Sequence, residues 1–491
     1  MAKVSAVKYP SWSKLPIGGV WKEGSSDRYE TVKNPYNGEA LAEIKLANKQ
    51  DIDEAYKKAK EAQAKWAKVS AYEKAALLEK VAEIINERRE EIVTLLVEES
   101  GSSQVKANVE VDASIGDARE AAKYPFQMEG TIHPSIIPGK ENRIYRNPIG
   151  VIGAITPWNW PFYLTIRVLA PAIATGNAIV LKADSQTPIT GGLLLAKIFE
   201  DAGLPEGLIN VIVADIAEIG DAMVEHPIPR VISFTGSTAA GQKIGALAGQ
   251  HLKKAALELG GNNVFIVLDD ADVDQAVSAA VFGKFFHQGQ ICISANRILV
   301  DRKVYPQFVE KFKEATAKVK VGNPAEDGNN IGPLINERQV ERIVKLIEQS
   351  ISEGAKVEIK GEVNGQLMSP FVLSEVTNDM AVAQNEIFGP VAAIIPVDSE
   401  QEAIEIANSS NFGLSGAVFS GSLERGIEVA HAIETGMIHV NDQTVNVEPT
   451  MPFGGEKLSG LGRYCGEAAL EEFTTVKWMS IQREPRQFPF S

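Results

Sequence analysis

The sequence predicts an α/β protein that contains parallel sheets. From residue 149 onward, short β-rich runs alternate with helical stretches, and strands joined by helices form parallel sheets through right-handed crossovers. The chain has 491 residues, enough for roughly two to four domains. Its hydrophobic content of 44% and charged content of 23% are typical of globular proteins. We therefore expect a globular protein with more than one domain.

Two amphipathic helices are expected first, over residues 51–67 and 71–99. Apolar residues of the second recur at helical spacing: Leu77, Leu78, Val81, Ile84 and Ile85. Gly101 is a plausible stop signal for this helix. The charged residues around both helices are expected to form a solvated face.

Two series of strands follow and divide the chain. The first is expected at residues 149–156, 178–181, 208–213 and 230–235, with helices at 193–202 and 239–248. The second is expected at residues 264–268, 297–300, 391–396 and 417–419. We place the boundary between two α/β domains near residues 258–262.

Composition excludes several classes of function. The net charge of −15 argues against a nucleic-acid binder, which needs a basic face. Two cysteines are too few for a disulfide framework. The N-terminus leads to no apolar core of signal-peptide length, and the apolar runs are too short to span a membrane. A cytoplasmic enzyme with no membrane or nucleic-acid partner is expected.

Cys292 is the most informative residue. It ends the segment Gly289-Gln290-Ile291-Cys292, and upstream Glu258 precedes a glycine pair in Glu258-Leu259-Gly260-Gly261. A cysteine thiolate is a strong nucleophile, a carboxylate can act as a base, and glycines allow close approach to the backbone. Together they indicate covalent catalysis beside a bound nucleotide.

Other interpretations of these residues are weighed beside the catalytic one. A lone cysteine is usually a small buried hydrophobe, which is our interpretation of Cys465. Glu258 could be a surface charge at the end of a helix. His287 lies near Cys292 in the sequence and raises the alternative of a Cys–His dyad.

A phosphate site is expected where the run Val231-Ile232 gives way to a helical pattern. Gly236 and Gly241 lie at this turn, and a helix N-terminus favours an anion. The segment lacks G-x-G-x-x-G, and Gln242-Lys243 replaces the Lys-Ser/Thr of a P-loop. An ordinary helix-capping turn is the alternative.

Six segments together resemble the aldehyde dehydrogenase superfamily over nearly the whole chain. They are Pro157-Trp158-Asn159-Trp160-Pro161, Phe234-Thr235-Gly236-Ser237, Glu258-Leu259-Gly260-Gly261, Gly289-Gln290-Ile291-Cys292, Glu386-Ile387-Phe388-Gly389-Pro390 and Pro452-Phe453-Gly454-Gly455-Glu456-Lys457-Leu458-Ser459-Gly460. Each alone is modest, but six in the family's order are specific.

The resemblance implies a mechanism. Cys292 would attack an aldehyde, and the side-chain amide of Asn159 with the backbone N–H of Cys292 would stabilise the oxyanion. Hydride would pass to NAD or NADP, and Glu258 would activate the water that releases the acid. No metal is expected, because the chain shows no H-E-x-x-H or C-x-x-C spacing.

The resemblance also assigns a cofactor site. In it Lys182 contacts the adenine ribose, Glu386 holds the nicotinamide ribose, and Phe388 packs on the nicotinamide ring. The full set of expected cofactor residues is Thr156, Pro157, Trp158, Lys182, Asp184, Ser185, Gly236, Ser237, Gly241, Leu259, Gly260, Glu386 and Phe388. The alternatives are a turn residue for Asn159, a solvated loop acid for Glu386 and a core aromatic for Phe388.

Cofactor choice is where the sequence departs from the common pattern. Many NAD-preferring members follow the Lys with Pro-x-Glu, and that Glu binds both ribose hydroxyls. Here Ala183 and Ser185 occupy the Pro and Glu positions. Without the carboxylate a 2′-phosphate meets less repulsion, so both NAD and NADP are expected to serve, unless Asp184 replaces the Glu.

The substrate expected from the resemblance is an aromatic aldehyde. Arg167 with the following Ala170-Pro171, and the Lys-x-Asp at Lys182, look like the benzaldehyde and vanillin dehydrogenase branch. Phe162, Tyr163, Phe285 and Phe286 could line an aromatic pocket. Core packing explains these aromatics almost as well, and an aliphatic or semialdehyde substrate is the alternative.

The family fold implies a division into domains. A Rossmann-like NAD(P)-binding domain is expected at residues 1–125 and 146–257, an α/β catalytic domain at 258–445, a small β oligomerisation element at 126–145 and 474–491, and an active-site loop and return at 446–473. The segment Val476-Lys477-Trp478-Met479 could pair as a strand. A homodimer or homotetramer is expected. Alternatives of other classes are a cofactor-independent cysteine acyltransferase or hydrolase, and a non-catalytic binding protein.

Overall fold

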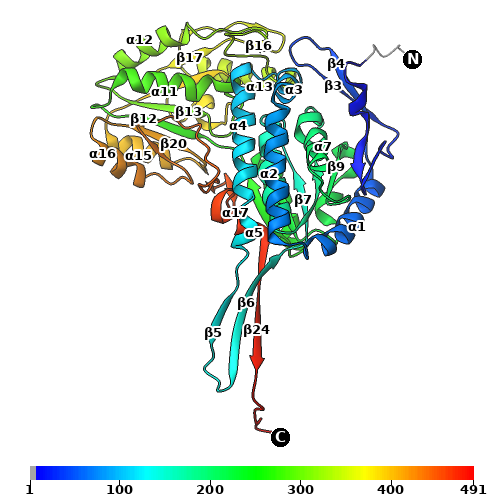
Figure 1. Ribbon diagram of the computed structural model, residues 1–491. Helices are drawn as coiled ribbons and strands as arrows, with labels where there is room; N and C mark the ends of the chain where they lie inside the picture. Colours follow the sequence, from blue (N-terminus) through cyan, green and yellow to red (C-terminus); the bar gives the residue numbers. More distant parts are fainter. Residues whose placement is uncertain (1–6, 491) are drawn as a thin grey trace.

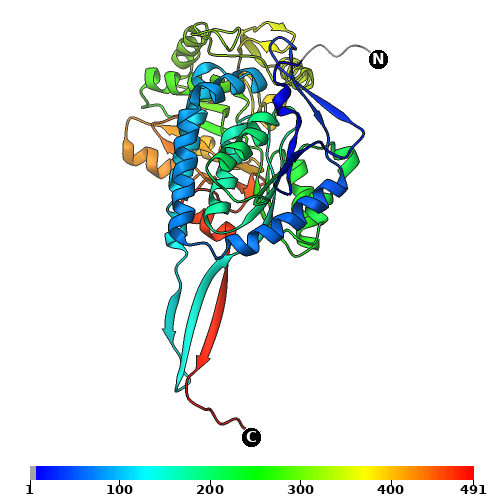
Figure 2. The same ribbon diagram turned by 45° about the vertical axis from the view of Figure 1, so that its right-hand side comes forward.

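Two α/β units lie side by side, and a long β arm projects from one end of the molecule (Figure 1). The computed structural model describes residues 7–490. Residues 1–6 of the expected cofactor domain and residue 491 of the expected oligomerisation element lie outside the described residues. In both views the C-terminus lies at the far end of the arm, away from the N-terminus (Figure 2).

The first sheet has six strands in the order β23-β11-β10-β7-β8-β9. Their bounds are β7 (Val151–Ile155), β8 (Ala178–Lys182), β9 (Ile209–Ile212), β10 (Val231–Thr235), β11 (Lys254–Glu258) and β23 (Gly460–Leu461). Strands β7 to β11 pair in parallel, which confirms the predicted parallel sheet. Strand β23 returns from far along the chain and pairs antiparallel with β11, so that Glu258 faces Gly460.

The second sheet has seven strands in the order β14-β17-β18-β13-β12-β20-β21. Their bounds are β12 (Asn263–Val267), β13 (Ala295–Asp301), β14 (Lys356–Ile359), β17 (Phe371–Ser374), β18 (Val391–Val397), β20 (Gly416–Phe419) and β21 (His439–Val440). Only β14 pairs antiparallel with its neighbour. The chain passes from the first sheet to the second between Glu258 and Asn263.

One predicted helix is two helices. Residues 71–99 form α2 (Ala71–Glu87) and α3 (Arg89–Ser100), because Arg88 between them has φ −95° and ψ 16°, which is outside the helical region. The prediction of one continuous helix is therefore wrong. The apolar spacing continues through Arg88 because both helices pack on the same partner, α4 (Gln104–Ala121). Gly101 ends α3 in the left-handed conformation with φ 67°, as expected of a helix stop.

Four helices belong to the two units. They are α4, α6 (Pro161–Ala174), α10 (Thr238–Gln250) and α11 (Val273–Phe285). Every residue of α6 is buried, including Thr165 and Arg167, so this helix has no solvent-exposed face and lies in the interior of the first unit.

The remaining helices and strands complete the two units. They are η1 (Pro10–Ser13), β1 (Leu15–Ile17), β2 (Val20–Lys22), β3 (Tyr29–Lys33), β4 (Ala40–Lys45), α1 (Lys49–Trp66), α5 (Tyr124–Gln127), η2 (Ile189–Leu193), α7 (Leu194–Asp201), α8 (Ile216–Ile219), α9 (Ala222–Glu225), η3 (Phe286–Gly289), α12 (Tyr305–Thr316), α13 (Glu337–Ser352), β15 (Val363–Asn364), β16 (Leu367–Met368), α14 (Ala381–Gln384), α15 (Glu400–Asn408), β19 (Phe412–Gly413), α16 (Leu423–His431), β22 (Glu456–Lys457) and α17 (Gly466–Phe473). No helix of the described part of the chain is long and apolar enough to cross a membrane.

The arm is a three-stranded antiparallel sheet. It consists of β5 (Thr131–Pro134), β6 (Lys140–Pro148) and β24 (Thr474–Gln482). The pairing of β24 with β6 includes Trp478 opposite Ile144, which confirms the strand predicted at Val476–Met479. Ile132, Val476 and Trp478 are all more than half exposed, so the arm presents apolar side chains outward.

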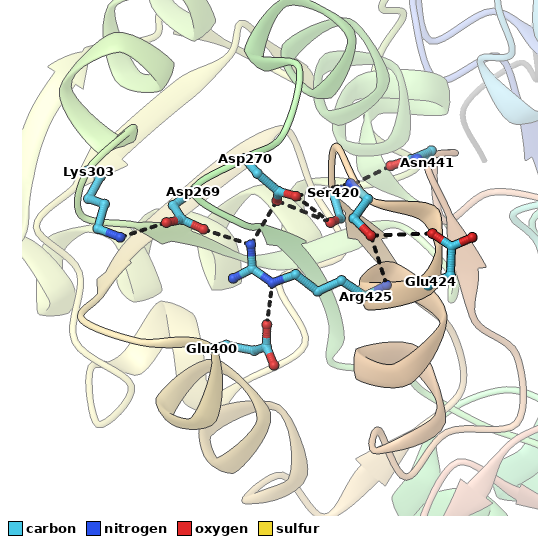
Figure 3. A network of polar contacts seen from close by, with 9 residues as sticks. Asp269, Asp270, Lys303, Glu400, Ser420, Glu424, Arg425 and Asn441 are labelled. Atoms are coloured by element: carbon cyan, nitrogen blue, oxygen red, sulfur yellow. Dashed lines mark hydrogen bonds and ion pairs between the residues drawn. The ribbon is translucent and has the colours of Figure 1, made fainter.

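An ion network covers the carboxyl ends of the second sheet's strands (Figure 3). The guanidinium of Arg425 lies 2.8 Å from a carboxylate oxygen of Asp269, 3.0 Å from Asp270 and 2.7 Å from Glu400. Lys303 adds a contact of 2.6 Å to Asp269. These residues come from the ends of β12 and β13 and from α15 and α16, so the network joins four elements.

Candidate active site

The two sheets meet at a cavity of about 350 Å³. It is lined by Pro157, Trp158, Asn159, Leu164, Thr235, Gly236, Ser237, Glu258, Leu259, Gly260, Cys292, Gln339, Arg342, Glu386 and Phe388. The first sheet contributes the carboxyl ends of its strands, which is where open α/β sheets bind ligands. The second sheet contributes segments that precede the amino ends of β13 and β18.

Cys292 lies on a loop whose main chain is tightly held. The side-chain amide of Asn263 donates to the carbonyl oxygens of Cys292 at 2.7 Å and Ser294 at 2.8 Å. A Cβ added to Gly261 would lie 2.4 Å from the Cys292 carbonyl oxygen, so this position requires glycine. Burial and then the charge of Glu258 raise the pKa of the Cys292 thiol to about 12. Cys292 is therefore a thiol at neutral pH and must lose a proton to react.

Glu258 is the last residue of β11 and has a free carboxyl group. Its side chain is buried, and neither carboxyl oxygen has a hydrogen-bond partner among the described residues. Burial raises the pKa of this carboxyl to about 8, although the charges of Arg167 and Arg463 oppose the shift. A buried carboxyl group with such a pKa and no partner can accept a proton near neutral pH.

Asn159 lies between the end of β7 and the start of α6. Its side chain is buried, and its Nδ2 donates to the carbonyl oxygen of Gln290 at 2.9 Å. The loop that carries Cys292 is thus joined to the segment that carries Asn159. Both residues line the same cavity, as the sequence predicts.

A second cavity of about 200 Å³ opens on the same cysteine. It shares Asn159, Leu164 and Cys292 with the first cavity. Its other lining residues are Val109, Ala113, Trp160, Tyr163, Arg167, Phe282, Phe286, Ile291, Ile293, Gln443, Val445, Asn446, Val447 and Phe453. Cys292 therefore stands where two cavities meet, one with glycine-rich and polar walls and one with mainly aromatic and apolar walls.

The structure divides the four aromatic residues that could line a pocket. Tyr163 and Phe286 line the second cavity, but Phe162 and Phe285 do not. Phe162 is fully buried in the core around α6, and Phe285 packs on Phe312 with ring centroids 6.0 Å apart. Of the two interpretations left open by the sequence, core packing holds for Phe162 and Phe285, because their helical positions turn them toward core rather than cavity.

Three further aromatic residues line the second cavity, although the sequence did not assign them to a pocket. These are Trp160, Phe282 and Phe453. Phe282 stacks on Phe286 with a centroid distance of 4.7 Å. The two residues are four apart in the sequence, and this spacing could have indicated that their rings meet. Phe453 arrives from a remote segment and gives no local signal.

Arg167 places an unpartnered guanidinium at the second cavity. The side chain is 2% exposed, and none of its nitrogens has a hydrogen-bond partner among the described residues. The guanidinium carbon lies 4.4 Å from the Phe453 ring centroid and 5.0 Å from that of Tyr464. Cation–π contacts hold the charge while its donors stay available to a ligand.

Eight of the expected cofactor residues line the first cavity: Pro157, Trp158, Gly236, Ser237, Leu259, Gly260, Glu386 and Phe388. The rings of Trp158 and Phe388 meet edge to face at 5.5 Å. Glu386 accepts a hydrogen bond of 3.0 Å from the backbone of Gly261, and burial raises the pKa of its carboxyl to about 7. A Cβ on Gly260 would lie 2.6 Å from the Glu386 carboxylate, so a larger residue there would displace that side chain.

The other five expected residues do not line this cavity. Thr156, Lys182, Asp184 and Ser185 lie at or after the carboxyl ends of β7 and β8. Asp184 accepts a hydrogen bond of 2.9 Å from the backbone of Gln186, within its own turn. Gly241 lies inside α10, where a Cβ would come within 2.2 Å of Leu259, so its glycine serves helix packing.

Gln339 and Arg342 of α13 are lining residues that the sequence did not suggest. Arg342 donates to the carbonyl oxygen of Glu386 at 3.0 Å and also to that of Ile387. These contacts fix the segment that carries Glu386 and Phe388. Helix α13 lies about fifty residues before Glu386 and Phe388 in the sequence. Its spacing of apolar residues is that of an ordinary amphipathic helix, so no local pattern indicates the contact.

The first cavity suits a dinucleotide. Ser237 precedes α10 and makes no side-chain capping bond, so the first N–H groups of this thirteen-residue helix are available to a phosphate. Gly236 and Gly260 allow backbone approach, while Glu386 offers a carboxylate to ribose hydroxyls. Residues of this site would therefore hold NAD or NADP along the carboxyl edge of the first sheet.

His287 does not form a dyad with Cys292. It is fully buried and lines neither cavity, and neither ring nitrogen has a hydrogen-bond partner among the described residues. Burial and the nearby charge of Lys106 hold its pKa well below the usual range. The imidazole is therefore neutral and stands apart from the reacting groups.

The chain belongs to the aldehyde dehydrogenase family. The sequence model described as "Aldehyde dehydrogenase family" matches residues 21–479. The chain is 52% identical to a benzaldehyde dehydrogenase of Bacillus subtilis, over 98% of this chain and 100% of the relative. It is 49% identical to a vanillin dehydrogenase of Corynebacterium glutamicum, over 96% of this chain and 98% of the relative.

A solved structure confirms the fold. The crystal structure of a NAD-dependent benzaldehyde dehydrogenase from Corynebacterium glutamicum is similar with a TM-score of 0.89 and 45% identity, and the match covers 98% of this chain and 100% of that one. The predicted family, fold class, aldehyde dehydrogenase activity and nicotinamide cofactor are therefore confirmed.

Proposed function

We propose that this aldehyde dehydrogenase oxidises aromatic aldehydes to carboxylic acids with Cys292 as the covalent nucleophile. The observation that carries the proposal is the position of Cys292 at the junction of two cavities. One cavity has a glycine-rich edge that suits a dinucleotide. The other is walled by Trp160, Tyr163, Phe286 and Phe453 and suits a flat apolar ring.

Covalent attack begins the reaction. The Cys292 sulfur, after losing its proton, forms a bond to the aldehyde carbon, and the carbonyl π electrons move to oxygen. The Asn159 amide then donates a hydrogen bond to the oxyanion. Bound NAD or NADP supplies the acceptor for the hydride, so that a thioester remains on Cys292.

Hydrolysis completes the reaction. Glu258 takes a proton from water, and the resulting hydroxide adds to the thioester carbon. The carbon–sulfur bond then breaks, its electron pair returns to Cys292, and the carboxylic acid leaves. The unpartnered carboxyl of Glu258 supports this role because no protein donor competes for its oxygens.

Two features support an aromatic substrate. The relatives at 52% and 49% identity are named benzaldehyde and vanillin dehydrogenases. The guanidinium of Arg167, which has no hydrogen-bond partner among the described residues, can bond an oxygen substituent on a ring. We further propose the cofactor roles of Thr156, Lys182, Asp184 and Ser185 at the edge beyond the first cavity.

We also propose a function for each domain and a way in which copies of the chain assemble. The first sheet with its helices would be the NAD(P)-binding domain, and the second the catalytic domain. The arm, with its exposed Ile132, Val476 and Trp478, would pair with another copy in a homodimer or homotetramer. The enzyme would act in the cytoplasm.

Steady-state kinetics test the proposal. Purified enzyme is given benzaldehyde, vanillin and hexanal, each with NAD and with NADP, and reduced cofactor is followed by absorbance. We expect the largest kcat/KM for an aromatic aldehyde. A larger value for hexanal would contradict the aromatic assignment. Release of acid without reduced cofactor would support a hydrolase instead.

A further inference from the structure

A buried ion pair on α4 reaches the segment that carries Asn159. The Lys106 ammonium is fully buried and contacts the Glu110 carboxylate one helical turn further along. It also donates to the backbone carbonyl oxygen of Asn159 at 3.0 Å and lies 4.7 Å above the Trp160 ring. Every one of these contacts is made inside the protein.

Glu110 holds the other side of the same segment. Its second carboxylate oxygen accepts from the backbone N–H groups of Phe162 at 2.9 Å and Tyr163 at 3.1 Å. These are among the first N–H groups of α6, and Trp160 at the N-cap makes no side-chain capping bond. A neighbouring helix thus supplies the cap that the local sequence lacks.

The segment between these contacts has no regular structure of its own. Residues 156–160 join β7 to α6, and Asn159 is the fourth of these five residues. With its carbonyl oxygen held by Lys106 and the following helix start held by Glu110, the backbone around Asn159 is fixed on both sides. Its Nδ2 is then aimed at the loop of Cys292, where it donates to Gln290.

We propose that the Lys106–Glu110 pair positions the Asn159 amide for the oxyanion. Burying both charges is costly, and an apolar pair of similar size packs as well or better. What the ion pair provides is three directed hydrogen bonds, one from Lys106 and two to Glu110, with a backbone that must hold one orientation. Lys106 and Glu110 are positioning residues, since neither lines the dinucleotide cavity. The inference rests on the proposed role of Asn159.

The test compares Lys106→Met with Lys74→Met. Lys74 is another buried lysine, on α2, with its ammonium 6.0 Å from the Trp66 ring and remote from the site. With benzaldehyde and NAD, we expect Lys106→Met to slow the formation of reduced cofactor about ten- to a hundredfold, somewhat less than the loss of one oxyanion donor. Lys74→Met should leave this rate within about twofold.

An isotope effect identifies the step. If Lys106 acts on the oxyanion, the hydride step becomes slower, and benzaldehyde deuterated at the formyl carbon should show a larger isotope effect on kcat in Lys106→Met. Affinity for NAD, measured by fluorescence titration without substrate, should be unchanged. A slower rate with the isotope effect of the parent enzyme would overturn the proposal.

A double-mutant cycle separates this proposal from the role of Asn159 itself. In an Asn159→Ala background, Lys106→Met should change the rate less than about twofold, because the amide that it positions is gone. An equally large effect in both backgrounds would show that Lys106 acts elsewhere. If Asn159→Ala alone has no effect on hydride formation, the role of Asn159 as oxyanion donor is wrong. That result is distinct from a failure of the Lys106 proposal alone.

Glu110→Gln keeps the test decisive if Lys106→Met does not fold. The amide oxygen can still accept from the α6 backbone, while the charge that fixes Lys106 is lost. We expect a smaller loss, about three- to tenfold, with the same dependence on Asn159. An unchanged rate and isotope effect in a folded Glu110→Gln enzyme would contradict the proposal.

Discussion

The two sheets are built alike but face the active site with opposite ends. Strands β7, β10 and β11 of the first sheet point their carboxyl ends at the cavity, and Glu258 ends β11 there. The second sheet presents segments that precede its strands, with Cys292 three residues before β13. Its carboxyl ends lie under the ion network of Arg425 (Figure 3).

The difference follows from the chemistry at strand ends. Helices that follow parallel strands point their N-termini at the carboxyl edge, which favours phosphates, so that edge of the first sheet suits a dinucleotide. The corresponding edge of the second sheet is closed by satisfied ion pairs. The second sheet instead offers a loop that is held by Asn263 and bears a thiol. Five predictions test this contrast.

The largest effect is expected at the amino edge of the second sheet. Cys292→Ala should lower aldehyde oxidation by more than about a hundredfold, because no other group can form the thioester. NAD binding, measured by fluorescence titration, should persist since the first sheet is untouched. Cys465→Ala is the control, because Cys465 is buried and lines neither cavity. A large loss with Cys465→Ala would move the nucleophile to that residue.

The next effect is expected at the carboxyl edge of the first sheet. Glu258→Gln should slow turnover about a hundredfold yet leave a burst of reduced cofactor in the first cycle, because only thioester hydrolysis needs the base. Stopped-flow absorbance distinguishes the two phases. A variant with no burst would assign Glu258 to thiol activation instead.

The raised pKa of Glu258 predicts how kcat depends on pH. A base acts only when deprotonated, and the pKa of Glu258 is raised to about 8, so hydrolysis-limited kcat should fall about tenfold per unit as the pH drops below 8. The profile is measured under saturating aldehyde and NAD. Glu258→Gln should lose this limb; an unchanged limb in the variant would assign the titration to another group.

Cofactor selectivity should respond less strongly. Ser185→Glu should shift the ratio of kcat/KM values toward NAD by about ten- to a thousandfold, because a carboxylate near a 2′-phosphate costs about 1–4 kcal/mol. Asp184 is held in its own turn by Gln186, which favours Ser185 as the determinant. If the parent enzyme is strict for NAD and Asp184→Ala relaxes it, Asp184 has that role instead.

The smallest catalytic effect is expected at the closed edge of the second sheet. Arg425→Met should leave kcat/KM within about twofold but lower the free energy of unfolding by about 1 kcal/mol, since its ion pairs are partly exposed to solvent. Lys303 and Arg425 lower the pKa of Asp269 to about 2, so this contribution is present above pH about 4 and is lost as the pH falls toward 2. Denaturant titrations at pH about 4 and at pH about 2 measure this contribution to the free energy of unfolding. A large loss of activity would mean that both edges of the second sheet matter to catalysis.

The sequence by itself determined the family, the parallel sheets and the reacting groups. Short β-rich runs between helices are local patterns, so β7, β8, β10 and β13 could be predicted within two residues of their bounds. Cys292, Glu258 and Asn159 stand in ordered motifs, and the structure gathers all three around one cavity. Their chemistry is carried by residue type, which the sequence states directly.

The tertiary structure decided which neighbours surround those groups. Apolar periodicity cannot tell a wall of the substrate cavity from core, so the sequence left Phe162 and Phe285 open between the two and did not assign Phe453 to the pocket. The break at Arg88 depends on a single backbone conformation that apolar spacing does not encode. Gly241 lets α10 pack closely against the side chain of Leu259, which lies eighteen residues further along the chain. Long-range packing makes these choices, since each depends on atoms brought together only when the chain has folded.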